Sequence, residues 1–128
     1  MDEQRLNAVS LAVVQAAIEI HRTIGPGLLE SVYKACLRYE LRERGLANVA
    51  EQVLPIRYKK LVLDGEYRID FLVEDAVIVE LKAVEAVLPV HHAQLLSYLR
   101  LADKRLGLLI NFNVPVLVKG IRRIVNNL

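Results

Sequence analysis

The chain lacks a second cysteine, so it cannot form an internal disulfide bond. Cys36 is the single cysteine among 128 residues, and the three histidines are scattered along the chain. A structural zinc site takes a closed set of four cysteine or histidine ligands, and none is expected here. An unpaired thiol fits a reducing compartment, so we expect a cytoplasmic protein.

Long apolar runs and a leader sequence are also missing. The longest apolar candidates, 11–20 and 106–110, are interrupted or short, whereas a helix that crosses a bilayer needs about 20 apolar residues. The first residues, 1–5, carry mixed charge, and no small-residue cleavage site follows an apolar core. We therefore expect neither a membrane span nor a signal peptide.

The excess of charge of one sign is small. The net charge of +2 does not by itself indicate binding to nucleic acid. The cations are nevertheless clustered, in one stretch with Arg57, Lys59 and Lys60 and in another with Lys119, Arg122 and Arg123. Such clusters either contact phosphates or form ordinary solvated surfaces, and the sequence leaves both interpretations open.

The apolar content and its periodicity predict the fold class. The length of 128 residues fits one domain, 1–128, and a hydrophobic fraction of 54% supplies a core. Apolar residues at helical spacing predict helices over 7–23, 29–44 and 89–102, the first ending at Gly25-Pro26-Gly27. Alternating or apolar stretches predict strands over 53–59, 61–63, 67–73, 76–81, 106–111, 116–119 and 121–125. This order predicts an α/β fold, with helices flanking a mixed central β-sheet.

Two of these strands form a predicted hairpin. A one-residue change of register would move apolar side chains to the wrong face, so a three-residue loop over 74–76 is favoured. The predicted pairs are Val73 with Val77, Phe71 with Val79, and Asp70 with Glu80. The side chains expected to share one face of the first strand are Tyr67, Ile69, Phe71 and Val73.

The opposed acids of this hairpin suit a divalent cation. Opposed residues have Cβ atoms about 4.5–5.5 Å apart, so Asp70 and Glu80 repel and one pKa rises unless a cation intervenes. Lys82 lies on the same face as Glu80, two residues on. Mg²⁺ binds one or two carboxylates together with water and substrate phosphates. The set therefore suits metal-assisted phosphodiester hydrolysis, with Lys82 orienting the water or stabilising developing charge; the alternative is a solvated polar stripe.

The pattern formed by Asp70, Glu80 and Lys82 resembles that of the PD-(D/E)XK nuclease superfamily. Residues 27–33, Gly-Leu-Leu-Glu-Ser-Val-Tyr, resemble the GxxExxY signature of a small prokaryotic family within it. The segments similar to the same family are 21–30, 78–85, 93–98 and 107–112, so the resemblance covers nearly the whole chain. One departure is Arg68-Ile69, which stands where a proline usually precedes the first acid.

The resemblance implies a restriction-endonuclease-like core and a Mg²⁺- or Mn²⁺-dependent phosphodiesterase that acts on nucleic acid, with DNA as the expected substrate. The implied metal ligands are Asp70, Glu80 and the carbonyl of Leu81, with Lys82 as the catalytic lysine. Glu30 would correspond to a helix-borne acid near the metal; the alternative is an acid favoured by the helix dipole. The competing hypothesis is a catalytically silent nuclease fold that binds nucleic acid or regulates a partner.

Supporting residues are expected around this centre. Gln94 and Tyr98 share one face of the third predicted helix, and they resemble a Q-x-x-x-Y motif that lies beside the acids in some superfamily members. His91 lies on the same stripe, where it either caps the helix or helps to bind substrate. Tyr33 either hydrogen-bonds Glu30 or caps the core. A homodimer, formed through the terminal strands or the first helix, is expected by analogy.

Overall fold

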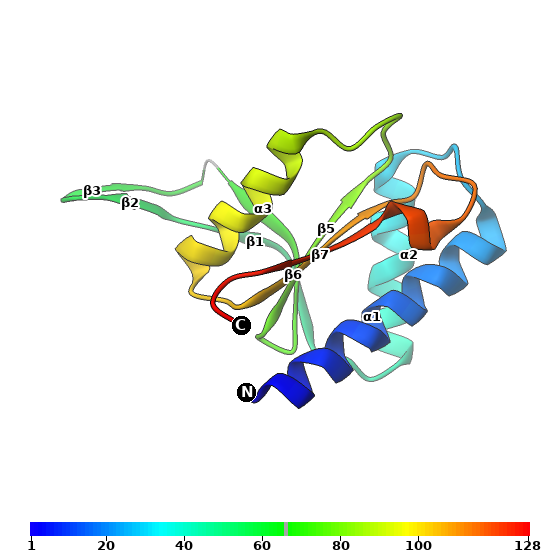
Figure 1. Cartoon of the computed structure of the whole chain (residues 1–128), viewed down its shortest axis with the longest axis horizontal. Helices are drawn as coiled ribbons and strands as arrows, with labels where there is room; N and C mark the ends of the chain where they lie inside the picture. The colour runs from blue at the N-terminus through cyan, green and yellow to red at the C-terminus, as the bar shows by residue number, and fades with distance from the viewer. Residues whose placement is uncertain (66) are drawn as a thin grey trace.

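The computed structural model describes residues 1–65 and 67–128, and its central element is a mixed five-stranded sheet (Figure 1). The strands lie in the order β1 (Asn48–Val53), β4 (Arg68–Val73), β5 (Val77–Lys82), β6 (Leu106–Asn111) and β7 (Ile121–Val125). Only the β5–β6 pair among these neighbours is parallel, and the other three pairs are antiparallel. The predicted α/β fold with a mixed central sheet is confirmed.

Helices cover both faces of the sheet, as Figure 1 shows. The first face packs against α1 (Glu3–Ile24) and α2 (Glu30–Glu43), whereas α3 (Pro89–Ala102) packs against the second. The largest fully buried side chains of the first layer are Tyr33, Leu37, Leu41, Phe71, Leu81, Leu106, Leu108 and Phe112. The second layer contains Ile69, Leu72, Ile78, Leu95, Tyr98, Leu99 and Leu109. Strands β5 and β6 are thus buried on both faces.

The helix boundaries follow from local chemistry. Helix α1 ends where Gly25 adopts φ 72° and donates its N–H to the His21 carbonyl, which confirms the predicted stop. The helix begins at Glu3 rather than near residue 7, because the Asp2 side chain accepts the Arg5 N–H and caps the first turn. Helices α2 and α3 lie within a residue of their predicted bounds.

The predicted strand over 53–59 is confirmed only for its central residues, and its bounds were wrong. Val53 ends β1, Leu54 and Pro55 leave the ladder, and β2 (Ile56–Tyr58) pairs only with β3 (Leu61–Leu63). This separate β2–β3 ribbon projects from the body of the molecule in Figure 1. Strand β1 escaped detection because its more buried side alternates Asn48, Ala50 and Gln52 instead of large apolar residues.

The predicted strand over 116–119 is also wrong, since a short 3-10 helix, η1 (Leu117–Gly120), occupies this place. The Lys119 N–H donates to the Val116 carbonyl and tightens the chain there. Gly120 passes so close to β6 that an added Cβ would lie 2.2 Å from the carbonyl oxygen of Asn111. The turn therefore requires glycine before the chain enters β7.

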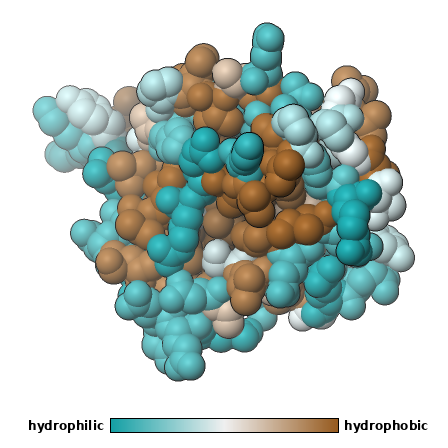
Figure 2. Space-filling model, turned by 45° about the vertical axis from the view of Figure 1, so that its right-hand side comes forward, coloured by the Kyte–Doolittle hydropathy of each residue, from teal (hydrophilic) through white to brown (hydrophobic). Residues whose placement is uncertain are grey.

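Apolar atoms remain on the surface as well as in the core. Figure 2 shows hydrophobic residues gathered between hydrophilic ones on one face. The most exposed large apolar residues of α1 and of the η1 segment include Leu11, Ile18, Val116 and Val118. No helix within the described ranges is long and apolar enough to cross a membrane.

Candidate active site

The β4–β5 hairpin has the predicted register. Phe71 pairs with Val79 and Val73 with Val77, so the three-residue loop over 74–76 is confirmed. Glu74 and Asp75 both adopt φ 53°, which fits the tight turn. The loop fixes how far each strand runs from the turn, and it sets Asp70 at the level of Glu80.

The two strands stop pairing through their backbones where these acids lie. The Asp70 N–H donates to Glu80 Oε2 at 3.1 Å, and the Leu81 N–H donates to Asp70 Oδ2 at 2.9 Å. Each carboxylate thus accepts a main-chain hydrogen bond from the opposite strand, in place of a carbonyl oxygen. These bonds fix both acids between the strands, so Asp70 and Glu80 converge as expected.

The pleat of β4 is interrupted at Asp70. Phe71 and Val73 lie in the α1–α2 layer, but Ile69 packs beneath α3, so the expectation that all three share a face is wrong. The pairing of β1 with β4 also skips this level, where Glu51 adopts φ 53°. Carboxylate hydrogen bonds replace the regular ladder here, so simple alternation does not hold across the site.

The environment of Glu80 disfavours its charge. Its residue surface is only 6% exposed. Burial, and then repulsion by Asp70, raise the pKa of Glu80 to about 9, although Lys82 acts in the opposite direction. Burial and this repulsion thus favour the neutral form of Glu80, which is the state expected of one acid in a crowded pair.

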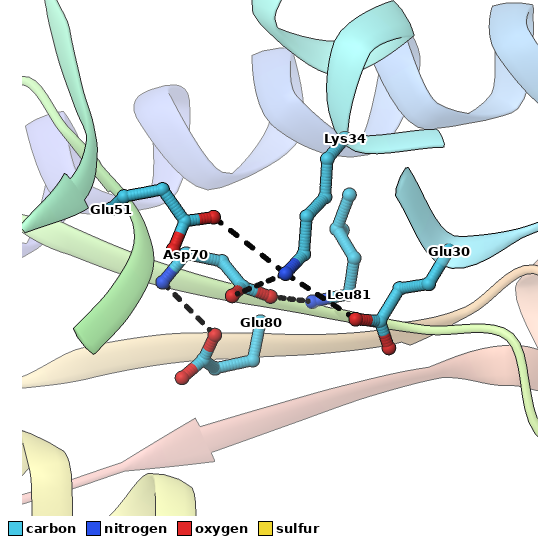
Figure 3. A network of polar contacts seen from close by, with 6 residues as sticks. All are labelled: Glu30, Lys34, Glu51, Asp70, Glu80 and Leu81. Carbon is cyan, nitrogen blue, oxygen red and sulfur yellow. Dashed lines mark hydrogen bonds and ion pairs between the residues drawn. The ribbon is translucent and has the colours of Figure 1, made fainter. Parts of the chain in front are cut away.

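A lysine that sequence reasoning missed completes the cluster, as Figure 3 shows. Lys34 Nζ, from α2, lies 3.1 Å from Asp70 Oδ1, 3.3 Å from Glu30 Oε2 and 3.6 Å from Glu51 Oε1. Burial alone would lower the pKa of Lys34, but the charge of Asp70 and the hydrogen bonds to Asp70 and Glu30 raise it above its usual range. The Glu30-x-x-x-Lys34 spacing was the available sequence signal.

Lys82 ends β5 beside the same acids. It pairs in register with Asn111 of β6, and its charge favours the ionised form of Glu80. Lys82 is the second residue after Glu80 along the strand, so both lie on the same face as Ile78, which packs in the α3 layer. The site thus contains two acids between strands, Lys82 on one strand and Lys34 from the helix layer.

The comparison with known families agrees with this arrangement. The sequence model of a family described as the PD-(D/E)XK nuclease superfamily matches residues 7–124. The chain belongs to the PD-(D/E)XK nuclease superfamily. No curated protein and no solved structure matches it. Membership supports a nuclease-like function in general, and the fold is that of a restriction-endonuclease-like core.

In this PD-(D/E)XK chain, Tyr33 has a structural place. Its side chain is fully buried, its hydroxyl donates to the Gly25 carbonyl at 2.7 Å, and it accepts the Leu28 N–H at 3.1 Å. The ring stacks on Phe112 with centroids 4.4 Å apart. Of the two interpretations of Tyr33, the structure favours the one in which it caps the core. Glu30 instead contacts Lys34, which links it to Asp70.

The α3 residues divide between the helix end and the acids. His91 Nδ1 accepts the Leu88 N–H at 3.0 Å, so His91 caps the start of α3. Tyr98 is 6% exposed, and burial followed by the charge of Glu80 raises the pKa of Tyr98 to about 12. Gln94 lies one turn before Tyr98 and is partly buried. Tyr98 is therefore the α3 residue whose environment the acid pair most directly affects.

Asn111 is a supporting residue that the sequence analysis did not single out. It is 2% exposed, its Oδ1 accepts the Val84 N–H at 3.0 Å, and its Nδ2 donates to the Val84 carbonyl at 2.9 Å. This pair of bonds anchors the chain just after Lys82. A buried asparagine that ends an apolar strand was the available signal.

The donor set fits a divalent cation that the PD-(D/E)XK family generally uses. Two carboxylates converge, and burial together with the repulsion between them raises the pKa of Glu80. Within 1–65 and 67–128, no three Asp, Glu, His or Cys side chains are arranged to hold an ion by themselves. The remaining ligands would come from the Leu81 carbonyl, water and substrate phosphate, as Mg²⁺ commonly accepts.

Proposed function

We propose that this protein is a Mg²⁺- or Mn²⁺-dependent nuclease that hydrolyses phosphodiester bonds in nucleic acid, with DNA as the preferred substrate. The observation that carries the proposal is the pair of carboxylates, Asp70 and Glu80, which the sheet fixes between two strands. Their mutual repulsion makes the pair a site that gains from a cation. A bound Mg²⁺ would polarise the phosphate and lower the pKa of a water molecule.

The roles proposed for the chain's own residues follow from their positions. Asp70 and Glu80 would bind the ion together with the Leu81 carbonyl, and Glu30 would approach from α2. Lys82 would orient the water or stabilise charge on the phosphate. Gln94 and Tyr98 would line the substrate side of α3, one or two turns beyond the cap that His91 forms.

The finer family assignment is also a proposal. In the segment 27–33, Gly27 adopts φ 93°, Glu30 contacts Lys34, and the Tyr33 hydroxyl holds the Gly25–Leu28 turn. Each residue of the GxxExxY pattern thus has a physical reason for its place. We assign the chain to this prokaryotic family on that basis, as a single domain over 1–128. The homodimer stays a prediction, which the exposed apolar residues of α1 and η1 support.

Replacing Lys82 by alanine tests catalysis directly. We expect metal-dependent DNA cleavage by Lys82→Ala to fall by about 100-fold, the cost of losing one charge-stabilising donor. Mn²⁺ affinity, measured by calorimetry, should stay within a few-fold of the wild-type value, because Lys82 is not a ligand. Cleavage would be followed on linear, supercoiled and single-stranded DNA and on RNA, with EDTA as the metal-free control.

Cleavage at the same rate by wild type and Lys82→Ala would contradict the proposal and point to a contaminating nuclease. Binding of DNA and Mn²⁺ without any cleavage would favour the second candidate, a silent nuclease fold that binds or regulates. The presence of both acids and of Lys82 in one site favours the catalytic alternative.

The β2–β3 ribbon supplies a surface for phosphates. Arg57, Lys59 and Lys60 lie along it, and the Lys59 ammonium lies 5.3 Å from the centre of the Tyr58 ring. The ribbon comes just before β4 in the sequence, and Asp70 is the third residue of β4. The cations of the ribbon are therefore close to Asp70 along the chain. A two-stranded ribbon also fits the major groove of DNA.

Neutralising the ribbon should weaken DNA binding and its salt dependence. We expect the triple change Arg57→Gln, Lys59→Gln and Lys60→Gln to lower the slope of log affinity against log salt by about 0.9 for each phosphate that the protein no longer neutralises. The measurement is fluorescence anisotropy of labelled duplex DNA in EDTA. The matched control removes the same charge at Lys119, Arg122 and Arg123. Equal reductions in both variants would show that only net charge matters.

A further inference from the structure

The ammonium group of Lys34 lies where three carboxylates meet. Its distances to Asp70, Glu30 and Glu51 are 3.1, 3.3 and 3.6 Å, and the side chain is 27% exposed. These three acids come from three different elements, β4, α2 and β1. Figure 3 shows Lys34 reaching from α2 to Asp70 on the sheet, with Glu51 on one side and Glu30 on the other.

Both oxygens of Asp70 are already engaged in this arrangement. Oδ2 accepts the Leu81 N–H at 2.9 Å, and Oδ1 contacts Lys34 Nζ at 3.1 Å. The Leu81 N–H belongs to the backbone of β5, which pairs with β6 at this level and cannot withdraw alone. The Lys34 ammonium group, by contrast, lies at the end of a flexible side chain with four rotatable bonds, so it can move away. A second cation at Asp70 would therefore exchange with Lys34 and leave the Leu81 contact intact.

We propose that Lys34 is a tethered cation that occupies Asp70 in the metal-free protein and competes with the divalent ion for it. The inference rests on the proposed metal-dependent function and adds a residue that sets the metal affinity. Lys34 is a positioning residue, because it acts through Asp70 and Glu30. It screens the repulsion among the acids until the ion arrives, and it lowers the affinity for that ion.

Glu30 and Glu51 give the displaced ammonium a place to remain. Lys34 contacts both acids as well as Asp70, so it can leave Asp70 without losing every ionic partner. Glu51 is half exposed, with 52% of its side chain accessible, and pairing there costs little desolvation. The exchange is thus a short movement within one cluster.

Replacing Lys34 by methionine separates competition from a purely structural role. Methionine keeps an unbranched apolar stem of four heavy atoms but removes the ammonium group and its charge. We expect Lys34→Met to bind Mn²⁺ at least tenfold more tightly by calorimetry, while its unfolding temperature in EDTA falls below that of the wild type. Lys34→Arg keeps the cation and should not bind more tightly. The rise in unfolding temperature on adding Mn²⁺ should be larger for Lys34→Met than for the wild type.

Lys104→Met is the matched control. Lys104 has a similarly covered side chain, 23% exposed, and pairs with Asp75 at 3.3 Å in the hairpin turn. Its replacement should leave Mn²⁺ affinity unchanged. Unchanged or weaker Mn²⁺ binding by Lys34→Met, with wild-type binding intact, would overturn the competition and leave the proposed function standing. Absence of Mn²⁺ binding by both proteins would count against the proposed function itself.

Discussion

Glu80→Gln is expected to stabilise the metal-free protein at neutral and alkaline pH while it removes Mn²⁺ binding. Burial and repulsion by Asp70 raise the pKa of Glu80 from 4.5 to about 9. Because the folded pKa lies above the unfolded value, folding takes up a proton between these two pKa values. The contribution of Glu80 to stability is complete below the unfolded pKa, and it is lost as the pH rises through the folded pKa.

The unfolding temperature of the wild type in EDTA should therefore decline from around pH 5 to around pH 9. Glu80→Gln, which is neutral throughout, should lack this part of the decline. Removing the proposed ligand Glu80 should also lower the metal affinity, and by more than the factor of about 10–100 that is typical when a residue in contact with a ligand is replaced. Unfolding scans over this pH range and Mn²⁺ calorimetry measure the two effects.

Glu43→Gln is the control for Glu80→Gln, since Glu43 is exposed at the end of α2. It removes the same charge from the surface and should leave the pH dependence close to that of the wild type. An equal decline in wild type and Glu80→Gln would show that Glu80 is ionised in the metal-free protein, which contradicts the crowded-pair account.

Gly120→Ala is expected to destabilise the fold by about 3 kcal/mol or more, the upper part of the range for overpacking. The new methyl carbon would lie 2.2 Å from the Asn111 carbonyl oxygen, and backbone cannot yield as a side chain does. The clash would separate η1 from the end of β6, where Asn111 also anchors Val84. Urea-induced unfolding measures the loss of stability.

Gly107→Ala is the matched comparison within the same sheet. Its new Cβ would lie 3.1 Å from side-chain carbons of Leu95, which can adjust, so we expect a cost of about 1 kcal/mol. Equal costs for the two substitutions would contradict the assignment of the Gly120 effect to a backbone clash.

The hairpin and the three helices were predictable because their patterns are local. The alternation of Phe71 and Val73 in one strand and of 76–81 in the next, with the short loop between them, determines the β4–β5 register without knowledge of the rest. The end of the first helix was predictable from Gly25 and the proline that follows it, and Gly25 indeed adopts a positive φ. Asp70 and Glu80 could therefore be paired from the sequence, and so could Lys82 on the same strand as Glu80.

The parts that escaped prediction depend on contacts between distant segments. Ile69 leaves the face of Phe71 because carboxylates replace the ladder at Asp70, which no period-two pattern encodes. Lys34 could be paired with Glu30 from their spacing, but its contact with Asp70 requires the packing of α2 on the sheet. Gly120 forms a tight turn only because β6 lies beside it.

The hydrogen bonds that Asp70 and Glu80 accept from the backbone have a consequence for how the site loses its metal affinity on heating. Each carboxylate accepts a hydrogen bond from the backbone of the neighbouring strand, so its orientation is fixed by the same bonds that join β4 to β5. Such ligands cannot loosen while the strands stay together, in contrast to ligands on a mobile loop. We therefore expect the protein to keep its affinity for the ion on heating until the whole sheet unfolds cooperatively.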